Sequence, residues 1–152
     1  MKPESETYKA KLLSKDSGIR NAAITQLAQS GDAKQLDFLM SVLLDKRIGN
    51  GVSTAIRAIG DFRNESGKNV LIEIYGSVND NGKKLIIESL LKLGAFAKFF
   101  PGNTATKNVQ EQLWPLLFGL NSDQLKGILA LGPGEFNDKL EFAWKATKHW
   151  RK

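Results

Sequence analysis

The sequence has no cysteine, one histidine and four prolines among its 152 residues. Without cysteine the chain can form no disulfide bond, no thiolate nucleophile and no cysteine-based zinc site. A metal site built around His149 would need several carboxylates, and no cluster of Asp and Glu occurs in the sequence. His149 also lacks a nearby acid that would orient it as a general base, so we expect a solvated surface histidine. We therefore expect no catalytic residues, no metal and no cofactor.

Long apolar runs are also missing. The longest stretches, such as LWPLLFGL, are far shorter than a membrane span. The N-terminal sequence MKPESETYKAKLL has no apolar run of the kind found in secretory signal peptides. These features predict a soluble, cytoplasmic protein, and a chain without cysteine fits a reducing compartment.

Acidic residues are in the minority, with 16 Asp and Glu against 22 Lys and Arg, which gives a net charge of +6. The excess is larger in residues 77–152, with 11 basic and 7 acidic residues, than in residues 1–76, with 11 and 9. A basic balance of this size is compatible with binding to nucleic acid, to an anionic membrane or to an acidic protein, and equally with solubility alone.

Two stretches of the chain superimpose at a period of 29 residues. Asp16 and Asp45 are each followed, fifteen residues later, by a Gly-Asp pair. The apolar positions between them also coincide, pairing Ile19 with Ile48, Ala23 with Val52 and Leu27 with Ile56. A fixed period in this range is typical of a helical solenoid.

Apolar residues recur at helical spacing along the whole chain, and no segment shows the alternation of a strand. We expect Asp16, Asp45 and Asn79 to begin helices and Gly31, Gly60 and Gly94 to end them. The spacing predicts further helices at about 4–14, 33–44, 65–78, 106–120, 123–131 and 135–150. Pro115 lies inside the helix at 106–120 and is expected to bend it.

The segments DSGIRNAAITQLAQSGD and DKRIGNGVSTAIRAIGD resemble HEAT-like repeats of the short, roughly 30-residue kind. The resemblance implies antiparallel helix pairs stacked into a right-handed superhelix. We expect residues 1–152 to form a single all-α domain, a right-handed α-solenoid of about four antiparallel helical pairs. The repeats are regular over about 16–94 and degenerate over 95–152.

The resemblance also implies a function, since HEAT-like proteins are mostly scaffolds, adaptors and protein-binding modules. In such stacks the second helices of the pairs line the concave face. The residues expected to bind a partner protein are Lys34, Asp37, Lys68, Asn69, Glu73, Lys107, Asn108, Glu111, Glu141 and Lys145. Their mixed charge suits a protein better than a nucleic-acid duplex, which would need uniform positive charge.

Two alternatives remain open at this point. The basic C-terminal half could bind nucleic acid through Lys145, Lys148, Arg151 and Lys152. A further hypothesis is an enzyme of the DNA glycosylase or phycobilin lyase type, since both types occur among HEAT-like proteins. Because the sequence contains no catalytic constellation, we expect a non-enzymatic protein.

Aromatic residues gather in the C-terminal half. We expect Phe96, Phe99 and Phe100 to fill the gap where the repeat pattern loosens, with an exposed partner-binding loop as the alternative. Trp114 is expected in the core or at its edge, Trp144 in the core, and Trp150 against the terminal helix. The alternative for Trp144 and Trp150 is that they stack on nucleic-acid bases among the neighbouring lysines.

Overall fold

The computed structural model describes residues 10–29, 33–46, 49–102 and 107–150, and within these ranges every regular element is a helix. The α-helices are α2 Ser17–Ala28, α3 Ala33–Lys46, α4 Gly49–Asp61, α5 Gly67–Ile74, α6 Asp80–Lys92, α7 Lys107–Leu117, α8 Ser122–Leu129 and α9 Pro133–Ala146. Two short 3-10 helices follow α5 and α9, namely η1 Tyr75–Ser77 and η2 Lys148–Trp150. The all-α prediction is confirmed. Of the helix expected at about 4–14, only residues 10–12 are described as helical.

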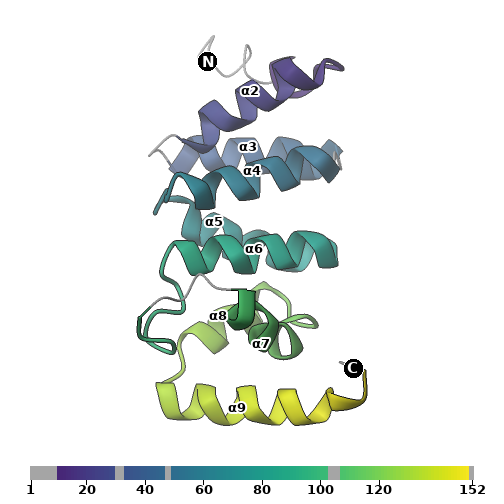
Figure 1. Cartoon of the computed structure of the whole chain (residues 1–152). Coiled ribbons are helices and arrows are strands. Elements are labelled where there is room, and N and C mark those ends of the chain that lie inside the picture. The colour runs from purple at the N-terminus through teal and green to yellow at the C-terminus, as the bar shows by residue number, and fades with distance from the viewer. Residues whose placement is uncertain (1–9, 30–32, 47–48, 103–106, 151–152) are drawn as a thin grey trace.

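The helices lie in two layers (Figure 1). The first layer contains α2, α4 and α6, and α4 packs on both of its neighbours, most extensively on α6. The second layer contains α3, α5 and α8, with α5 contacting both of the others. Up to α6 the chain therefore alternates between the layers, as the 29-residue period predicts.

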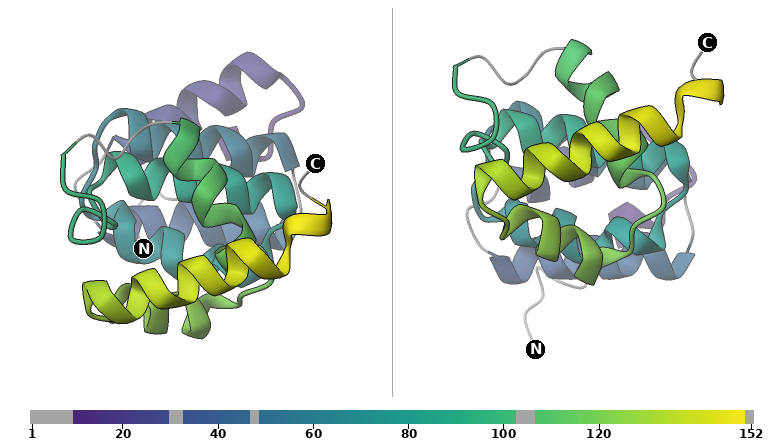
Figure 2. Two further views of the ribbon diagram at one scale, coloured as in Figure 1. Left: turned by 60° about the horizontal axis from the view of Figure 1, so that its bottom comes forward. Right: turned by 90° about the horizontal axis from the view of Figure 1, so that it is seen from below.

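After α6 the alternation fails. Helix α7 packs on α6 and α9, so it does not lie beside α5 as the second helix of a pair, which is where the sequence placed it. The second-layer position next to α5 is taken by α8 instead. Seen from below, α9 crosses the end of the stack with α7 and α8 on its two sides (Figure 2). The prediction that α7 and α9 continue the row of α3 and α5 is therefore wrong.

Three local predictions about helix ends are confirmed. Asp16 caps α2, since its Oδ1 accepts hydrogen bonds from the backbone N–H groups of Gly18 at 2.8 Å and Ile19 at 3.2 Å. Asn79 caps α6 by accepting from the N–H of Gly82 at 2.9 Å. Gly94 ends α6 with a φ of +79°, a conformation that disfavours any residue with a Cβ.

Three others are wrong. Gly60 does not end α4 but lies inside it, and the left-handed residue of the following turn is Arg63, with a φ of 54°. Asp45 lies in the last turn of α3 and does not begin α4. Ile19 is 48 % exposed, whereas the other two predicted members of the α2 stripe, Ala23 and Leu27, are buried together with Ile24 and Ala28. Gly31 and Ile48, which completed the repeat, lie outside the described residues.

The turn after α4 ties the first layer together. Asn64 is buried, and its side-chain amide donates a hydrogen bond to the carbonyl of Ala28, the last residue of α2, at 2.7 Å. Arg63 donates in the other direction, to the carbonyl of Lys92 at the end of α6, at 2.6 Å. Both bonds satisfy carbonyl groups that have no partner within their own helix. One turn thus fixes the ends of three successive first-layer helices.

Gly60 has a packing role that its place in the repeat does not reveal. A Cβ at this position would lie 2.5 Å from the Ser89 side-chain oxygen and 2.9 Å from the Ser89 Cα. Because the second clash is with backbone, α4 and α6 can approach closely only if residue 60 is glycine. The hydroxyl of Ser89 uses this approach to donate to the carbonyl of Ile56 at 2.8 Å.

Gly60→Ala is therefore expected to lower the free energy of unfolding by about 1–3 kcal/mol, since α6 must move away from α4. Gly127→Ala is the matched control, because Gly127 lies inside α8 and a Cβ there meets nothing within 4 Å. That control should stabilise the protein by about 0.5–1 kcal/mol through helix propensity. Urea denaturation measures both, and equal stabilisation by the two substitutions would contradict the close α4–α6 approach.

Candidate functional site

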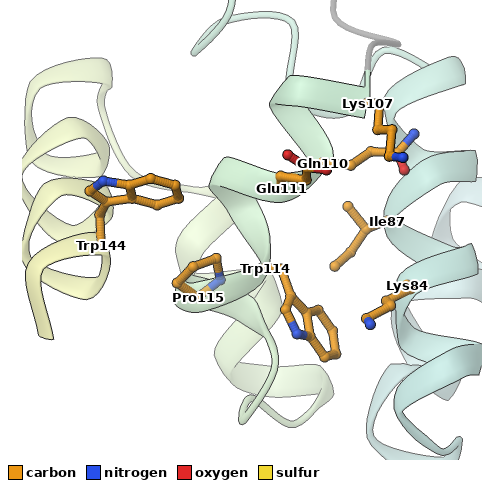
Figure 3. Close-up of a pocket in the computed structure, with 8 residues that line it drawn as sticks. All are labelled: Lys84, Ile87, Lys107, Gln110, Glu111, Trp114, Pro115 and Trp144. Carbon is orange, nitrogen blue, oxygen red and sulfur yellow. The ribbon is translucent and has the colours of Figure 1, made fainter. Parts of the chain in front are cut away.

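A hollow of about 550 Å³ lies where α6, α7 and α9 meet. We call it the tryptophan groove, and it is lined by Lys84, Ile87, Lys107, Gln110, Glu111, Trp114, Pro115 and Trp144 (Figure 3). The lining is mostly apolar with charged groups among it, which is the composition expected of a binding site. Trp144 on α9 and Ile87 on α6 lie on opposite sides of α7 in this view.

The position of α7 is fixed by polar contacts with η1 and α6. The hydroxyl of Tyr75 is buried and donates to the carbonyl of Leu117, the last residue of α7, at 2.7 Å. The ammonium group of Lys83 donates to the carbonyls of Phe118 and Leu120 just beyond, at 3.1 and 3.3 Å. A cation at this end of a helix also offsets the negative end of its dipole. The residues of α7 in the groove are therefore held against α6.

The position of α9 is fixed by an aromatic cluster near its N-terminal end. Phe99 stacks on Phe136 with ring centroids 3.8 Å apart, and Phe100 meets the same ring edge-on at 5.9 Å. Phe96, in the same loop, is fully buried. The expectation that these phenylalanines fill the gap left by the loosened repeat is confirmed. We call Phe99, Phe100 and Phe136 the aromatic clamp, and it fixes the helix that carries Trp144.

The two tryptophans of the groove differ in their surroundings. Trp114 is half-buried, lies 5.8 Å from the ring of Phe118, and has the ammonium group of Lys84 5.1 Å above its own ring. A cation over an indole ring at this distance is an attractive arrangement. Trp144 is 39 % exposed, so the prediction that it lies in the core is wrong, whereas Trp114 does lie at the core edge as expected.

A second hollow of about 500 Å³ shares Trp144 with the groove. We call it the acidic hollow, and it is lined by Gln112, Asn137, Asp138, Leu140, Glu141 and Trp144. Its two charged lining residues are both carboxylates. The groove, by contrast, is lined by two lysines and one glutamate. The exposed ring of Trp144 thus separates two hollows of opposite charge.

The residues that the sequence proposed for partner binding do not gather on one face. Lys34 and Asp37 are exposed on α3, and Asn69 is exposed on α5. Two others on α5 have partners within the chain, since Lys68 pairs with Glu65 at 3.2 Å and Glu73 forms an ion pair with Lys126 of α8.

The remaining proposed residues lie on α7 and α9. Lys107 and Glu111 line the groove, and Asn108 is exposed beside them. Glu141 lines the acidic hollow and pairs with Lys145 at 3.0 Å. Of the basic residues proposed for nucleic acid, Lys145 and Lys148 are exposed, whereas Arg151 and Lys152 lie outside the described residues, as does the side chain of Trp150. His149 is exposed, as predicted.

The sequence analysis did not predict Trp114 or Lys84 as site residues, and it favoured the core for Trp144, with stacking on nucleic-acid bases as the alternative. Trp144 follows Leu140 by four residues, so helical spacing alone placed it on the same buried stripe. In the structure, Phe136 and Leu140 of α9 pack in or against the core, whereas Trp144 is exposed. No signal in the sequence identified Lys84, whose role depends on the position of α7.

The altered ionisations in the described part of the chain belong to structural contacts. Burial raises the pKa of the Tyr75 phenol above its usual range, and the charge of Asp80 adds to the shift. The hydrogen bond to Glu73 raises the pKa of Lys126. Neither residue lines the groove. Over the described residues there is no group of three or more His, Asp or Glu side chains that could hold a metal ion.

No protein-family model matches the chain, and no match was found among curated proteins or solved structures. None of the described helices is long and apolar enough to cross a membrane.

Proposed function

We propose that the protein is a non-enzymatic module that binds a partner protein in the tryptophan groove. The observation that supports this most directly is the pair of tryptophans, Trp114 and Trp144, that line an open, mostly apolar hollow. Tryptophan is among the residues that contribute most to binding energy at protein interfaces. Both rings are held by rigid helices, so little conformational entropy is lost when a partner covers them.

The proposal keeps the scaffold or adaptor role suggested by the resemblance to HEAT-like repeats and changes the surface that carries it. We propose a right-handed solenoid for the part of the chain that contains the α2/α3 and α4/α5 pairs. We also propose a cytoplasmic location. The binding surface lies at the other end, where α7 departs from the repeat. Terminal units of a repeat stack commonly differ from the inner ones because they cap it.

A nucleic-acid ligand is supported less well. Two tryptophans and two lysines in one hollow are the groups that stack on bases and neutralise phosphates. However, Glu111 lines the same hollow, and Asp138 and Glu141 line the adjoining one. These carboxylates would repel a phosphate backbone crossing the surface.

The proposal is tested with the protein as bait for partners from its native cell, identified by mass spectrometry and then measured by calorimetry. Trp144→Ala is expected to weaken the identified complex by about 30-fold or more, the effect of losing an interface anchor of about 2 kcal/mol. Phe142→Ala is the matched control, because Phe142 lies on the same helix, is 76 % exposed and lines neither hollow.

The control should change affinity by less than about threefold, which corresponds to well under 1 kcal/mol. Circular dichroism and melting temperature must show that both variants fold. A protein partner that binds the Trp144→Ala and Trp114→Ala variants as tightly as the original chain would exclude the groove as its site. If the bait captures nucleic acid and no protein, with an affinity that falls steeply as salt is added, the result would favour a nucleic-acid ligand.

A further inference from the structure

The charges on the two sides of Trp144 carry information about what binds there. The tryptophan groove presents Lys84, Lys107 and Glu111, and the acidic hollow presents Asp138 and Glu141. A ligand that covers Trp144 and extends to both sides meets positive charge in one direction and negative charge in the other. Complementary charge across an interface sets the orientation of the partner and excludes partners of the wrong sign.

These charged groups are accessible to a ligand. Lys84 and Lys107 are both exposed, and Lys84 keeps its ammonium group over Trp114, where a partner carboxylate can approach it. Glu141 already pairs with Lys145, but both side chains of this pair are largely exposed, and exposed pairs contribute little to stability. A basic group of a partner can therefore share Glu141 at small cost, while Asp138 lies beside it in the same hollow.

Resting on the proposed function, we propose that the partner docks through a short segment of mixed charge, ordered about an apolar anchor. The anchor, an aromatic or large aliphatic side chain, packs on the exposed ring of Trp144. Acidic side chains on one side of the anchor meet Lys84 and Lys107. Basic side chains on the other side meet Asp138 and Glu141. A segment with a single sign of charge would be attracted on one side of Trp144 and repelled on the other.

The test uses a random-peptide display library as the probe, four baits and one control bait. The baits are the original chain, Trp144→Ala, a Lys84→Glu/Lys107→Glu variant and an Asp138→Lys/Glu141→Lys variant. A Lys15→Glu/Arg57→Glu variant is the control for the lysine reversal, because it changes the net charge equally at two exposed residues outside both hollows. Circular dichroism and thermal melting establish that every bait is folded.

Peptides enriched on the original chain should carry an apolar anchor with Asp or Glu on one side and Lys or Arg on the other. The lysine reversal should lower the affinity for these peptides by about tenfold. It should select new peptides that carry basic residues in place of the acidic ones and keep the basic residues on the other side of the anchor. The Asp138/Glu141 reversal should change only the basic side. The control variant should keep the original preference, with affinities within about threefold as measured by calorimetry.

The other outcomes separate the two proposals. The inference would be wrong if the peptides require Trp144 but show no consistent arrangement of charge. It would also be wrong if their arrangement of charge is unchanged in both reversal variants. In either case the proposed function would stand. An absence of any peptide that distinguishes the original chain from Trp144→Ala would overturn the groove as a protein-binding site, and the inference with it. Binding of single-stranded nucleic acid that the lysine reversal removes would overturn both in favour of a nucleic-acid ligand.

Discussion

Phe136→Ala is expected to lower the free energy of unfolding by about 3–5 kcal/mol, the range for truncating a buried phenylalanine. Phe136 is 1 % exposed and receives both other rings of the aromatic clamp, with Phe99 stacked on it and Phe100 edge-on. Its removal loses the buried area of the ring and leaves those two rings without their partner. Urea denaturation followed by far-UV circular dichroism measures the loss.

Phe142→Ala is the matched control for this substitution as well, because it removes the same atoms from the same helix at a position that is 76 % exposed. It should stay within about 0.5 kcal/mol of the original chain. Similar losses for Phe136 and Phe142 would show that the clamp does not hold α9.

Phe136→Ala is also expected to affect binding of the partner. Trp144 lies on α9, two turns beyond Phe136, so a helix released from the clamp no longer holds the indole in the groove. Phe136→Ala should therefore reduce both stability and partner affinity, whereas Trp144→Ala should reduce mainly affinity. Hydrogen exchange along α9 should rise in the first variant and stay near the original rate in the second.

Leu39→Ala and Ile56→Ala are each expected to lower the free energy of unfolding by about 2–4 kcal/mol. Both side chains are fully buried in the core, Leu39 on α3 and Ile56 on α4. Truncation removes methyl groups from a close-packed interior and leaves a cavity that the two layers fill only in part. Chemical denaturation measures the change.

Ile19→Ala provides a control of the same chemistry at a position that is 48 % exposed. This substitution should lower the free energy of unfolding by less than about 1 kcal/mol, because roughly half of the Ile19 side chain already faces water. If the Ile19 variant lost as much stability as the Ile56 variant, Ile19 would be buried, as the repeat predicted. That result would contradict the exposed position of Ile19 in the structure.

The regular repeats show how far sequence periodicity determines a fold. Leu27 and Ile56 occupy equivalent positions 29 residues apart, and both are buried. Asp16 and Asn79 begin helices because a short side-chain acceptor before a helical stripe satisfies backbone N–H groups locally. These features depend only on residues close together in the chain, so the sequence is sufficient to predict them.

Gly60 and Gly94 show where that reasoning fails. Both occupy the same place in the repeat, but only Gly94 ends a helix. Gly60 lies in the last turn of α4, where glycine is required because Ser89 of α6 leaves no space for a Cβ. A glycine required by a neighbouring helix and a glycine required by a turn look the same in the sequence, and only the packed structure distinguishes them.

The sequence by itself determined that the chain is helical, where most helices lie and that Asp16 and Asn79 cap two of them, because these features depend on spacing and local hydrogen bonds. The tertiary structure decided that α7 lies against α6 and α9, since the aromatic clamp and the contacts of Lys83 join residues far apart in the chain. It therefore also decided the candidate site. Trp144 and Lys84 face the same groove only because long-range packing brings α6, α7 and α9 together, and periodicity within a single helix holds no record of that packing.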